Sequence, residues 1–285
     1  MRRARASPPA GLTRRSFIAL APGAAVGLWL RPAWAVEAVR PLAEGAGQRS
    51  AIEREHVPAL RLPGFTTNGA KVPIVVEMSH PMTADHHVTS VEVVNEDDPI
   101  PSKGTFHFTP ANGRVYLAFQ ARMHGGSSQV SATAECNRHG RWTARRPIEI
   151  PADAGGCGGA APAPATAASG EEVRGPVIRL RELVERGRLR RDELVHVQVK
   201  MRHPNRTGLV FRDGGFVQES EPLYLEELEV HYAGERVSRF EMTPALADDP
   251  LITFALTARS EGPLRVVVVN SRRQKFEATH EIRFS

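Results

Sequence analysis

Cys157 is the residue in this chain with the clearest chemical potential, and its neighbours are Gly155, Gly156, Gly158 and Gly159. A cysteine thiol forms reversible covalent bonds with other sulfur atoms. Glycine has no Cβ and adopts φ values of either sign, so four glycines leave no side chain beside the sulfur and allow the backbone to bend freely. The pattern predicts an accessible thiol on a mobile segment.

The sequence around Cys157 contains no group that would activate it. No Lys, Arg or His lies within the eight residues that follow, and the nearest basic residue before it is Arg146. An unperturbed thiol with a pKa of about 8.5 is only a few per cent thiolate near pH 7. This favours a residue that carries a bound group over a catalytic nucleophile. An enzyme whose base reaches Cys157 only on folding is the alternative.

Cys136, the second cysteine, ends an alternation of apolar residues that begins at Val130. Such alternation places it on the inward face of a strand, where a free cysteine behaves as a small apolar residue. In an oxidising compartment, a disulfide between Cys136 and Cys157 is the alternative. A disulfide would immobilise the segment that the glycines make mobile, so we expect two free thiols.

The histidines offer weaker signals for a metal site. The adjacent pair His86–His87 would point to opposite faces of a strand, and such pairs rarely converge in a turn. His80 and His203 precede proline at matching places of a repeat, which favours a structural role. A copper site built on Met78, His80 and Met82 is the alternative, with fewer soft ligands than copper prefers. The sequence predicts no metal ion and no cofactor.

Three segments recur in the same order along the chain, and this indicates an internal duplication. The pairs are Val76–Pro81 with Val199–Pro204, Phe106–Ala111 with Phe240–Ala245, and Ala118–Arg122 with Ala255–Arg259. The offsets are 123, 134 and 137 residues, so an early loop is longer in the second copy, around Gly208 to Pro222. Two copies of one domain of roughly 95 to 110 residues explain this order.

Each copy reads as a β domain because short alternating segments are separated by turn residues. In the first copy the predicted strands are Val72–Met78, Val88–Asn95, Gly104–Phe108, Val115–Ala121, Val130–Cys136 and Trp142–Ile150. In the second they are Val195–Met201, Tyr224–Tyr232, Arg236–Glu241, Ile252–Thr257, Leu264–Val269 and Phe276–Phe284. We expect an all-β protein with two immunoglobulin-like antiparallel β-sandwich domains.

The remaining segments set the predicted boundaries. The sandwiches span residues 60–151 and 174–285, and a Gly/Ala/Pro-rich linker at 152–173 carries Cys157 and should be mobile. Residues 36–59 are expected to be partly helical, mainly over 43–55. Arg179 to Arg188 is either a short charged helix or a strand followed by a turn.

Residues 1–35 have the pattern of an export signal. Arg14 and Arg15 form a twin-arginine pair, a short apolar run follows, and Ala33-Trp34-Ala35 resembles a cleavage site. The apolar run is too short to span a membrane, so we expect a periplasmic protein without a membrane span. Six of the 37 basic residues lie in this segment, which leaves 31 against 32 acidic residues. This near-neutral balance argues against nucleic-acid binding.

The two halves resemble SoxY and SoxZ, the subunits of the sulfur-carrier complex of bacterial thiosulfate oxidation. The SoxY-like motifs are Asn68 to Val76, His80-Pro81-Met82-Thr83, Phe106 to Gly113 and the GGCGG element at 155–159. The SoxZ-like motifs are His203-Pro204-x-x-Thr207-Gly208-Leu209, Phe240 with Met242, and Pro250 to Phe254. The resemblance covers about residues 60–285, with residues 60–151 SoxY-like and residues 174–285 SoxZ-like.

The resemblance implies a carrier that is not itself an enzyme. Cys157 would be the site of covalent substrate attachment, and Gly155, Gly156, Gly158 and Gly159 would make it reachable. The implied periplasmic partners are a cytochrome pair with c-type haem that attaches the substrate, a manganese hydrolase and a sulfane dehydrogenase. The SoxZ-like domain would pack on the SoxY-like domain without contributing a catalytic residue.

This chain departs from the family pattern in one respect. In SoxY the GGCGG element is the free C-terminus, whereas here the chain continues into a second domain. Fused carriers of this kind are associated with quinoprotein (PQQ) dehydrogenases, which gives a second hypothesis for the partner. A module that only scaffolds periplasmic partners, without covalent cargo, is the third.

Overall fold

A computed structural model describes residues 50–158 and 173–285, which are built almost entirely from antiparallel strands. The strands of the first half are β1 (Ala59–Arg61), β2 (Val72–Met78), β3 (Val88–Asn95), β4 (Ser102–Phe108), β5 (Val115–Ala121), β6 (Gly126–Cys136) and β7 (Gly140–Ile150). Those of the second half are β8 (Arg174–Leu180), β9 (Glu193–Arg202), β10 (Leu209–Arg212), β11 (Gly215–Gln218), β12 (Leu225–Tyr232), β13 (Glu235–Met242), β14 (Leu251–Ala258), β15 (Gly262–Asn270) and β16 (Lys275–Ile282). The all-β prediction is confirmed.

All twelve predicted strands are present, and their alternation gives the core. In β2, for example, every second residue from Val72 to Met78 is buried, while the intervening side chains are partly or fully exposed. The segments that sequence patterns did not identify as strands are β1, β8, and the hairpin β10–β11. They lie at the sheet edges or outside the two main sheets. β1, β10 and β11 have only three or four residues, and β8 contains Gly175 and Pro176, although Pro176, Ile178 and Leu180 alternate with exposed residues.

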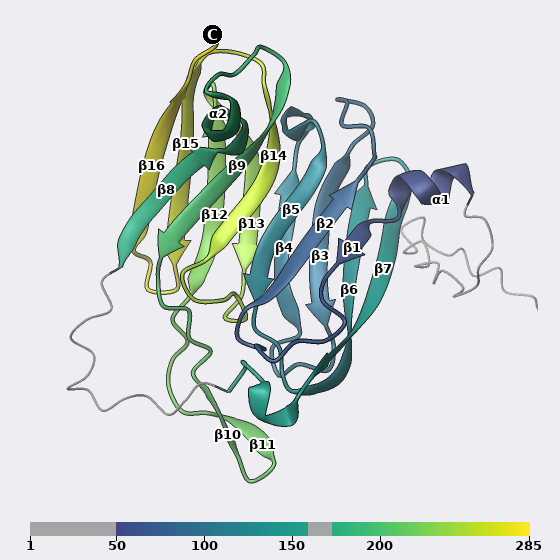
Figure 1. Cartoon of the computed structure of the whole chain (residues 1–285), viewed down its shortest axis with the longest axis vertical. Coiled ribbons are helices and arrows are strands. Elements are labelled where there is room, and N and C mark those ends of the chain that lie inside the picture. The colour runs from purple at the N-terminus through teal and green to yellow at the C-terminus, as the bar shows by residue number, and fades with distance from the viewer. Residues whose placement is uncertain (1–49, 159–172) are drawn as a thin grey trace, which may run out of the picture. The chain divides into compact units, whose positions relative to one another are not determined.

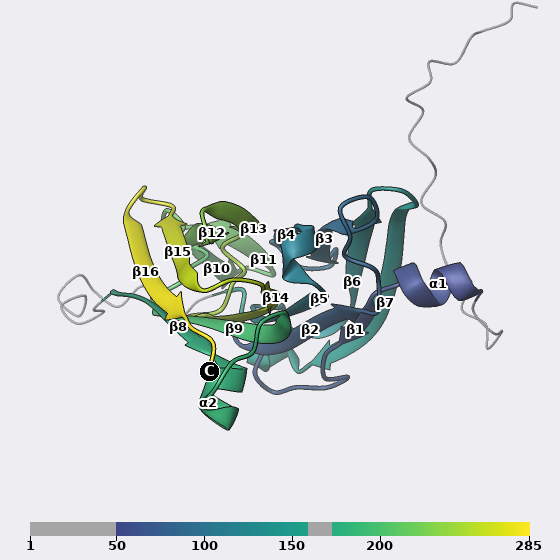
Figure 2. The same ribbon diagram turned by 90° about the horizontal axis from the view of Figure 1, so that it is seen from above.

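The strands form two sheets, and each sheet runs through both halves of the chain (Figure 1). The strand orders are β1-β2-β5-β14-β9-β8 in one sheet and β16-β15-β12-β13-β4-β3-β6-β7 in the other. Figure 2 shows the two sheets as layers, one over the other. The two predicted sandwiches are therefore present, but they are joined by strand pairing and not by the linker alone.

The junction has the pattern of a pseudo-two-fold axis. Phe106 and Phe240, which correspond in the duplication, are paired directly across β4 and β13. Leu117 and Phe254, which also correspond, are paired across β5 and β14. A two-fold contact brings equivalent residues of two copies together, as in a symmetric homodimer. The order of each sheet reads alike from either end, which supports the duplication.

Aromatic rings fill the core at this junction. Phe106, Phe240 and Phe254 are fully buried, and the ring of Phe240 lies 5.4 Å from that of Phe106 and 5.3 Å from that of Phe254. Tilted and edge-on rings at such spacing add to the free energy that burial provides. The hydrophobic core is consequently continuous from one half to the other.

Short helices complete the described chain. Helix α1 (Ala51–His56) begins at a Ser50 capping box, and α2 (Arg181–Arg186) follows β8 and ends at Gly187, where φ is +70°. Two 3-10 turns are η1 (Pro110–Asn112) and η2 (Ala152–Ala154). In residues 50–158 and 173–285, no helix has the length and apolar character needed to cross a membrane.

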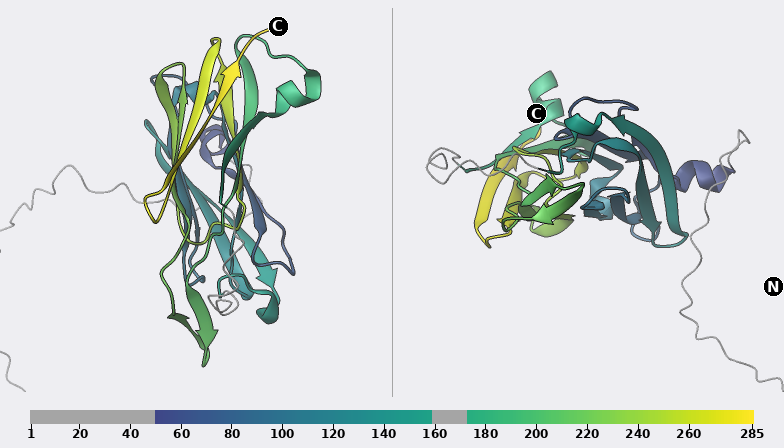
Figure 3. Two further views of the ribbon diagram at one scale, coloured as in Figure 1. Left: turned by 90° about the vertical axis from the view of Figure 1, so that its left-hand side faces the viewer. Right: turned by 90° about the horizontal axis from the view of Figure 1, so that it is seen from below.

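The β10–β11 hairpin extends past one end of the sheets, and η2 lies at that same end (Figures 1 and 3). This is the end at which β7 finishes and the chain turns toward Cys157. The hairpin and the residues after η2 come from different halves of the chain, yet they meet there.

Candidate functional site

The segment that carries Cys157, here called the arm (residues 151–158), is packed against the first half. The N–H of Gly69 donates to Ala154 O at 2.9 Å, and the N–H of Gly156 donates to Met123 O at 2.8 Å. These bonds are an extension of backbone pairing past the end of β7. The expectation of a freely mobile segment is therefore wrong for residues 152–158, whereas residues 159–172 lie outside the described part of the chain.

The glycines of the arm let its backbone lie directly against the backbone of neighbouring segments in this conformation. A Cβ on Gly156 would stand 2.3 Å from the backbone of Ala70, and one on Gly155 would stand 2.6 Å from the N of Gly125. Neither distance is compatible with a side chain unless the backbone moves. A Cβ on Gly158 would stand 3.3 Å from Phe211 N, a tight contact that a small shift would relieve, and Gly159 lies outside the described residues.

Cys157 itself is buried, with 1% of its surface exposed. This contradicts the prediction of an accessible thiol. The reason is that the small size of glycine, which makes a thiol reachable in an extended segment, also lets the backbone enter a narrow space and carry the thiol with it. In the conformation described here, Cys157 must leave its site before a partner can reach the sulfur.

Both halves of the chain hold the arm in place. Thr207, from the second half, donates its hydroxyl to Cys157 O at 2.8 Å. Arg122 donates to Gly156 O at 3.1 Å and also reaches Asn205 O and the Asp248 carboxylate in the second half, at 2.8 and 2.7 Å. Cys157 therefore lies at the junction of the two halves.

The charges near Cys157 are paired with one another. Asp98 and Lys103 form an ion pair at 2.5 Å, and both side chains are almost completely buried. Asp98 also accepts the N–H of His124 at 2.6 Å, while Lys103 donates to Ile100 O at 2.8 Å. Because Lys103 is engaged with Asp98, its charge is largely compensated before it can stabilise a thiolate.

Burial raises the pKa of the Cys157 thiol from 9.0 to about 12. Loss of hydration is the largest cause, and the negative charge of Asp98 adds to it, while Lys103 and Arg122 act in the opposite direction. A thiol with this pKa is fully protonated at neutral pH and is a poor nucleophile. The buried site thus stores an unreactive thiol, as the absence of activating residues in the sequence suggested.

The two cysteines are free thiols and lie at opposite ends of β6. Cys136 is its last residue, whereas the arm contacts Gly125, directly before its first residue. Eleven residues of extended strand span roughly 35 Å, and a disulfide requires Cα atoms within about 7 Å. The alternative Cys136–Cys157 bridge cannot form in this fold.

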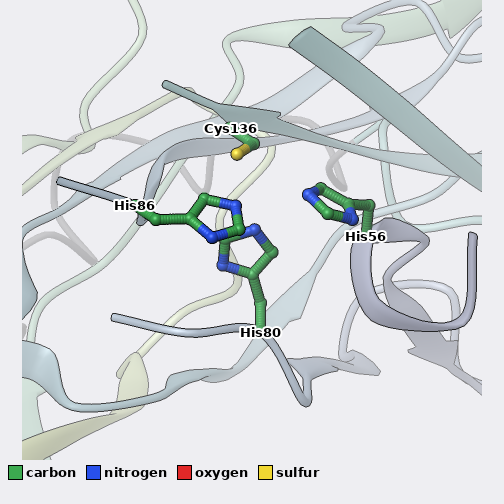
Figure 4. Close-up of side chains that lie close together, drawn as sticks. All are labelled: His56, His80, His86 and Cys136. Atoms are coloured by element: carbon green, nitrogen blue, oxygen red, sulfur yellow. The ribbon is translucent and has the colours of Figure 1, made fainter. Parts of the chain in front are cut away.

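Cys136 belongs to a second cluster, at the far end of β6 (Figure 4). His56, His80, His86 and Cys136 each place one donor atom within 4.8 Å of the others, and such a group could hold a metal ion. His86 and His87 do not converge, as expected, because the His87 ring contacts Thr83 O outside the cluster. His80 was expected to be structural, and the structure places it among these possible ligands. Met78 and Met82 are buried in the core instead.

One signal in the sequence could have indicated this cluster. Cys136 and His139 are separated by two residues, and strand β6 ends at Cys136 while β7 begins at Gly140. Two ligands on either side of a tight hairpin turn are brought together by the turn itself. The contribution of His56 could not be foreseen, because it depends on α1 packing beside that turn.

His203, the counterpart of His80 in the second half, does have the predicted structural role. Its Nδ1 lies 3.0 Å from Asn205 Oδ1, and its Nε2 lies 3.3 Å from Asn270 Nδ2. Both ring nitrogens therefore have partners in a buried network. Burial lowers the pKa of His203, which keeps the ring neutral.

Two protein families match the chain. Residues 43–157 match the family described as "Sulfur oxidation protein SoxY", and residues 185–281 match "Sulphur oxidation protein SoxZ". The first match ends on Cys157. No curated protein matches the chain significantly.

Solved structures give a likeness of fold to superoxide reductases. The chain is similar to superoxide reductase (neelaredoxin) from Ignicoccus hospitalis, with 24% identity, a TM-score of 0.30, and coverage of 35% of this chain and 87% of that one. A putative superoxide reductase from Thermotoga maritima has 24% identity and a TM-score of 0.29, and the match covers 35% of this chain and 91% of that one. Superoxide reductase from Nanoarchaeum equitans has 18% identity and a TM-score of 0.28, and the match covers 33% of this chain and 94% of that one. At these values the likeness adds nothing to the functional assignment.

Proposed function

The chain belongs to the SoxYZ family of sulfur-oxidation carrier proteins, with a SoxY domain and a SoxZ domain in one polypeptide, and we propose that it carries sulfur intermediates covalently on Cys157. The observation that carries this proposal is the position of Cys157. It is the last residue of the SoxY match, it stands among glycines, and its backbone is held at the junction of the two domains.

The chemistry of attachment requires a partner that accepts electrons. Joining the thiol sulfur of Cys157 to the terminal sulfur of thiosulfate forms an S–S bond and releases the thiol proton and two electrons. The carrier role that the family suggests assigns the acceptance of these electrons to a separate protein. A periplasmic c-type cytochrome is the partner that the family suggests. Partner enzymes would then remove the rest of the bound group while the S–S bond to Cys157 stays intact.

The buried thiol supports a cycle of two positions for the arm. In the buried position Cys157 is protonated and unreactive, which would protect it from side reactions in an oxidising compartment. Release of the arm would return the pKa toward that of an ordinary thiol and expose the sulfur to a partner. We propose export to the periplasm from the twin-arginine pattern of residues 1–35.

The direct test is intact-mass analysis of the protein purified from its native periplasm. We expect a mass increase that a reductant removes, and peptide mapping should assign it to Cys157. The Cys157→Ser variant should fold normally and carry no adduct. An unmodified thiol that stays inert with thiosulfate and an oxidising partner, together with normal function of Cys157→Ala, would contradict covalent carriage and favour a scaffold.

A second candidate partner is a quinoprotein dehydrogenase, which the fusion of the two domains suggests. Covalent cargo is common to both partner hypotheses, so the mass of the adduct separates them. A sulfane or thiosulfonate adduct supports thiosulfate oxidation. An adduct of other composition, formed only together with the dehydrogenase, supports the second system.

A further inference from the structure

We infer that His56, His80, His86 and Cys136, with His139 as a fifth donor, form a binding site for a first-row transition-metal ion. The site lies in the SoxY domain at the end of β6 that is farther from Cys157. It is independent of the carrier role proposed for Cys157, because no residue is shared between the two sites.

The donor atoms are gathered from five places in the domain. His56 ends α1, His80 follows β2, His86 precedes β3, Cys136 ends β6 and His139 lies in the turn before β7. His56 Nε2 lies 2.9 Å from His139 Nδ1, which in turn lies 3.9 Å from Cys136 Sγ. Metal bonds of about 2.0–2.3 Å place neighbouring donors of one ion about 3–4 Å apart. The donor atoms of His56, His80, His86 and Cys136 lie within 4.8 Å of one another, so binding an ion would draw the most distant pairs together by up to about 1 Å.

The protonation of the rings prepares them for a metal. His56 Nδ1 donates to Ile52 O at 2.8 Å, and His80 Nδ1 donates to Pro81 O at 2.6 Å. Each bond places the proton on Nδ1, so Nε2 keeps its lone pair and faces the cluster (Figure 4). Metal ligation requires such a free lone pair on the donor nitrogen.

Two buried nitrogens in the cluster have no hydrogen-bond partner among the described residues. They are His80 Nε2 and His86 Nε2. A buried polar atom without a partner costs about 1–3 kcal/mol, which proteins generally avoid. His80 is 95% buried, so water reaches it poorly. A metal ion would satisfy both lone pairs at once.

The sulfur also has the surroundings of a metal ligand. The backbone N–H of Arg138 points at Cys136 Sγ, with N and S 3.4 Å apart. An N–H···S hydrogen bond of this kind stabilises negative charge on a thiolate and fixes the direction of its lone pairs. The ring of Trp142 packs against that of His56, with the centroids 5.3 Å apart.

The duplication supplies an internal comparison. In the second half, His203 stands where His80 does, and Asn270 ends β15 as Cys136 ends β6. Asn270 and Asn205 satisfy both nitrogens of His203. The same fold therefore needs no metal at this position when amides surround the histidine. In the first half a thiol and further histidines replace the amides, which exchanges hydrogen-bond partners for metal ligands.

The donor set defines the class of ion. Imidazole and thiolate suit Zn²⁺, Fe²⁺, Co²⁺, Ni²⁺ and copper, whereas Ca²⁺ and Mg²⁺ require oxygen ligands. The four residues with converging donor atoms include no carboxylate. The site thus selects a first-row transition metal.

The test is Co²⁺ titration of the full-length, metal-stripped protein, followed by absorption spectroscopy. Co²⁺ is a spectroscopic probe for such sites, and ligation by Cys136 should produce a near-ultraviolet charge-transfer band that saturates at one ion per chain. Cys136→Ser should abolish that band. His86→Ala should weaken binding by about 100-fold or more, because losing even an outer-shell partner costs 10–100-fold.

Matched controls separate this site from others. His87→Ala changes the neighbouring histidine, whose ring bonds the backbone of Thr83 and lies outside the cluster, and it should bind Co²⁺ normally. Cys157→Ser should keep the charge-transfer band. Thermal unfolding of each metal-free variant shows whether it is folded, and saturating Co²⁺ should raise the Tm of the wild type but not of Cys136→Ser. Weak binding without a charge-transfer band, or a band that depends on Cys157, would overturn the proposal.

Discussion

The reactivity of Cys157 depends on where the arm lies. In the buried position the pKa of the thiol is about 12, compared with about 8.5 to 9 for an unperturbed cysteine. The buried arm therefore retains its proton between these values, whereas a released arm loses it. The sign follows from linkage: the buried position has its full stability below pH 9 and loses about 1.4 kcal/mol for each pH unit between pH 9 and pH 12.

This predicts the pH profile of alkylation at Cys157. With iodoacetamide at pH 7.5, Cys157 should react much more slowly in the folded protein than in urea. The rate should continue to rise from pH 9 to pH 11, because release of the arm becomes easier as pH increases. Peptide mapping after timed quenching gives the rate at each cysteine. A plateau near pH 9 would show that the thiol is freely exposed in solution.

The sequence singles out Cys157 as the distinctive residue, but it could not give the burial of the thiol. Four glycines are compatible with a free segment and with a tightly packed one, since both depend on the missing Cβ. Whether the segment is free or packed depends on its contacts with the backbone of Gly69, Ala70 and Met123, which are far away in sequence. Similarly, His80, His86 and Cys136 can be recognised as one possible metal site only when the fold brings the ends of their strands together.

At the scale of elements, the arm continues the edge of the SoxY sandwich. Gly69 and Met123 exchange backbone hydrogen bonds with the arm, and Gly156 crosses the backbone of Ala70 at a distance that excludes a Cβ. Hydrogen bonds of this kind contribute about 0.5–1.5 kcal/mol each, so a few of them hold the arm without locking it. A carrier arm has to be held with this modest strength if partners are to release it.

We therefore expect Gly156→Ala to release the arm without unfolding the protein. The added methyl group would meet Ala70 at 2.3 Å, while the core lies elsewhere. Alkylation of Cys157 at pH 7.5 should accelerate at least tenfold, and its pH profile should change to a plateau near pH 9. Gly64→Ala is the matched control, because a Cβ at Gly64 meets nothing within 4 Å. Equal rates in the two variants would mean that Gly156 does not hold the arm.

The strands were the most predictable elements, because period-two alternation depends only on local sequence. β2, β3 and β5 have the bounds that their alternation predicts. The pairing of β4 with β13 and of β5 with β14 was not predictable in this way. Alternation shows which face of a strand is buried, but it does not show with which other strand it pairs.

At the scale of the whole molecule, the fusion resembles a symmetric dimer whose subunits have been joined. Equivalent residues meet at Phe106–Phe240 and at Leu117–Phe254, and the core is continuous across them. Separating the halves would expose these aromatic side chains and two sheet edges on each half, and both kinds of exposed surface favour association. The covalent connection at residues 159–172 is therefore expected to contribute little to the stability of the pair.

A chain break introduced after Ala165 tests this expectation. The two fragments should co-purify at a ratio of one to one and unfold in a single transition, because neither half has a complete core without the other. In the background of Phe240→Ala, a change that costs about 3–5 kcal/mol in a buried aromatic core, the same break should separate or unfold the fragments. Size-exclusion chromatography with calorimetry distinguishes these outcomes. Two fragments that elute apart and unfold independently would show that the sandwiches are autonomous domains, and the arm would then lie beside a SoxZ domain that is free to leave.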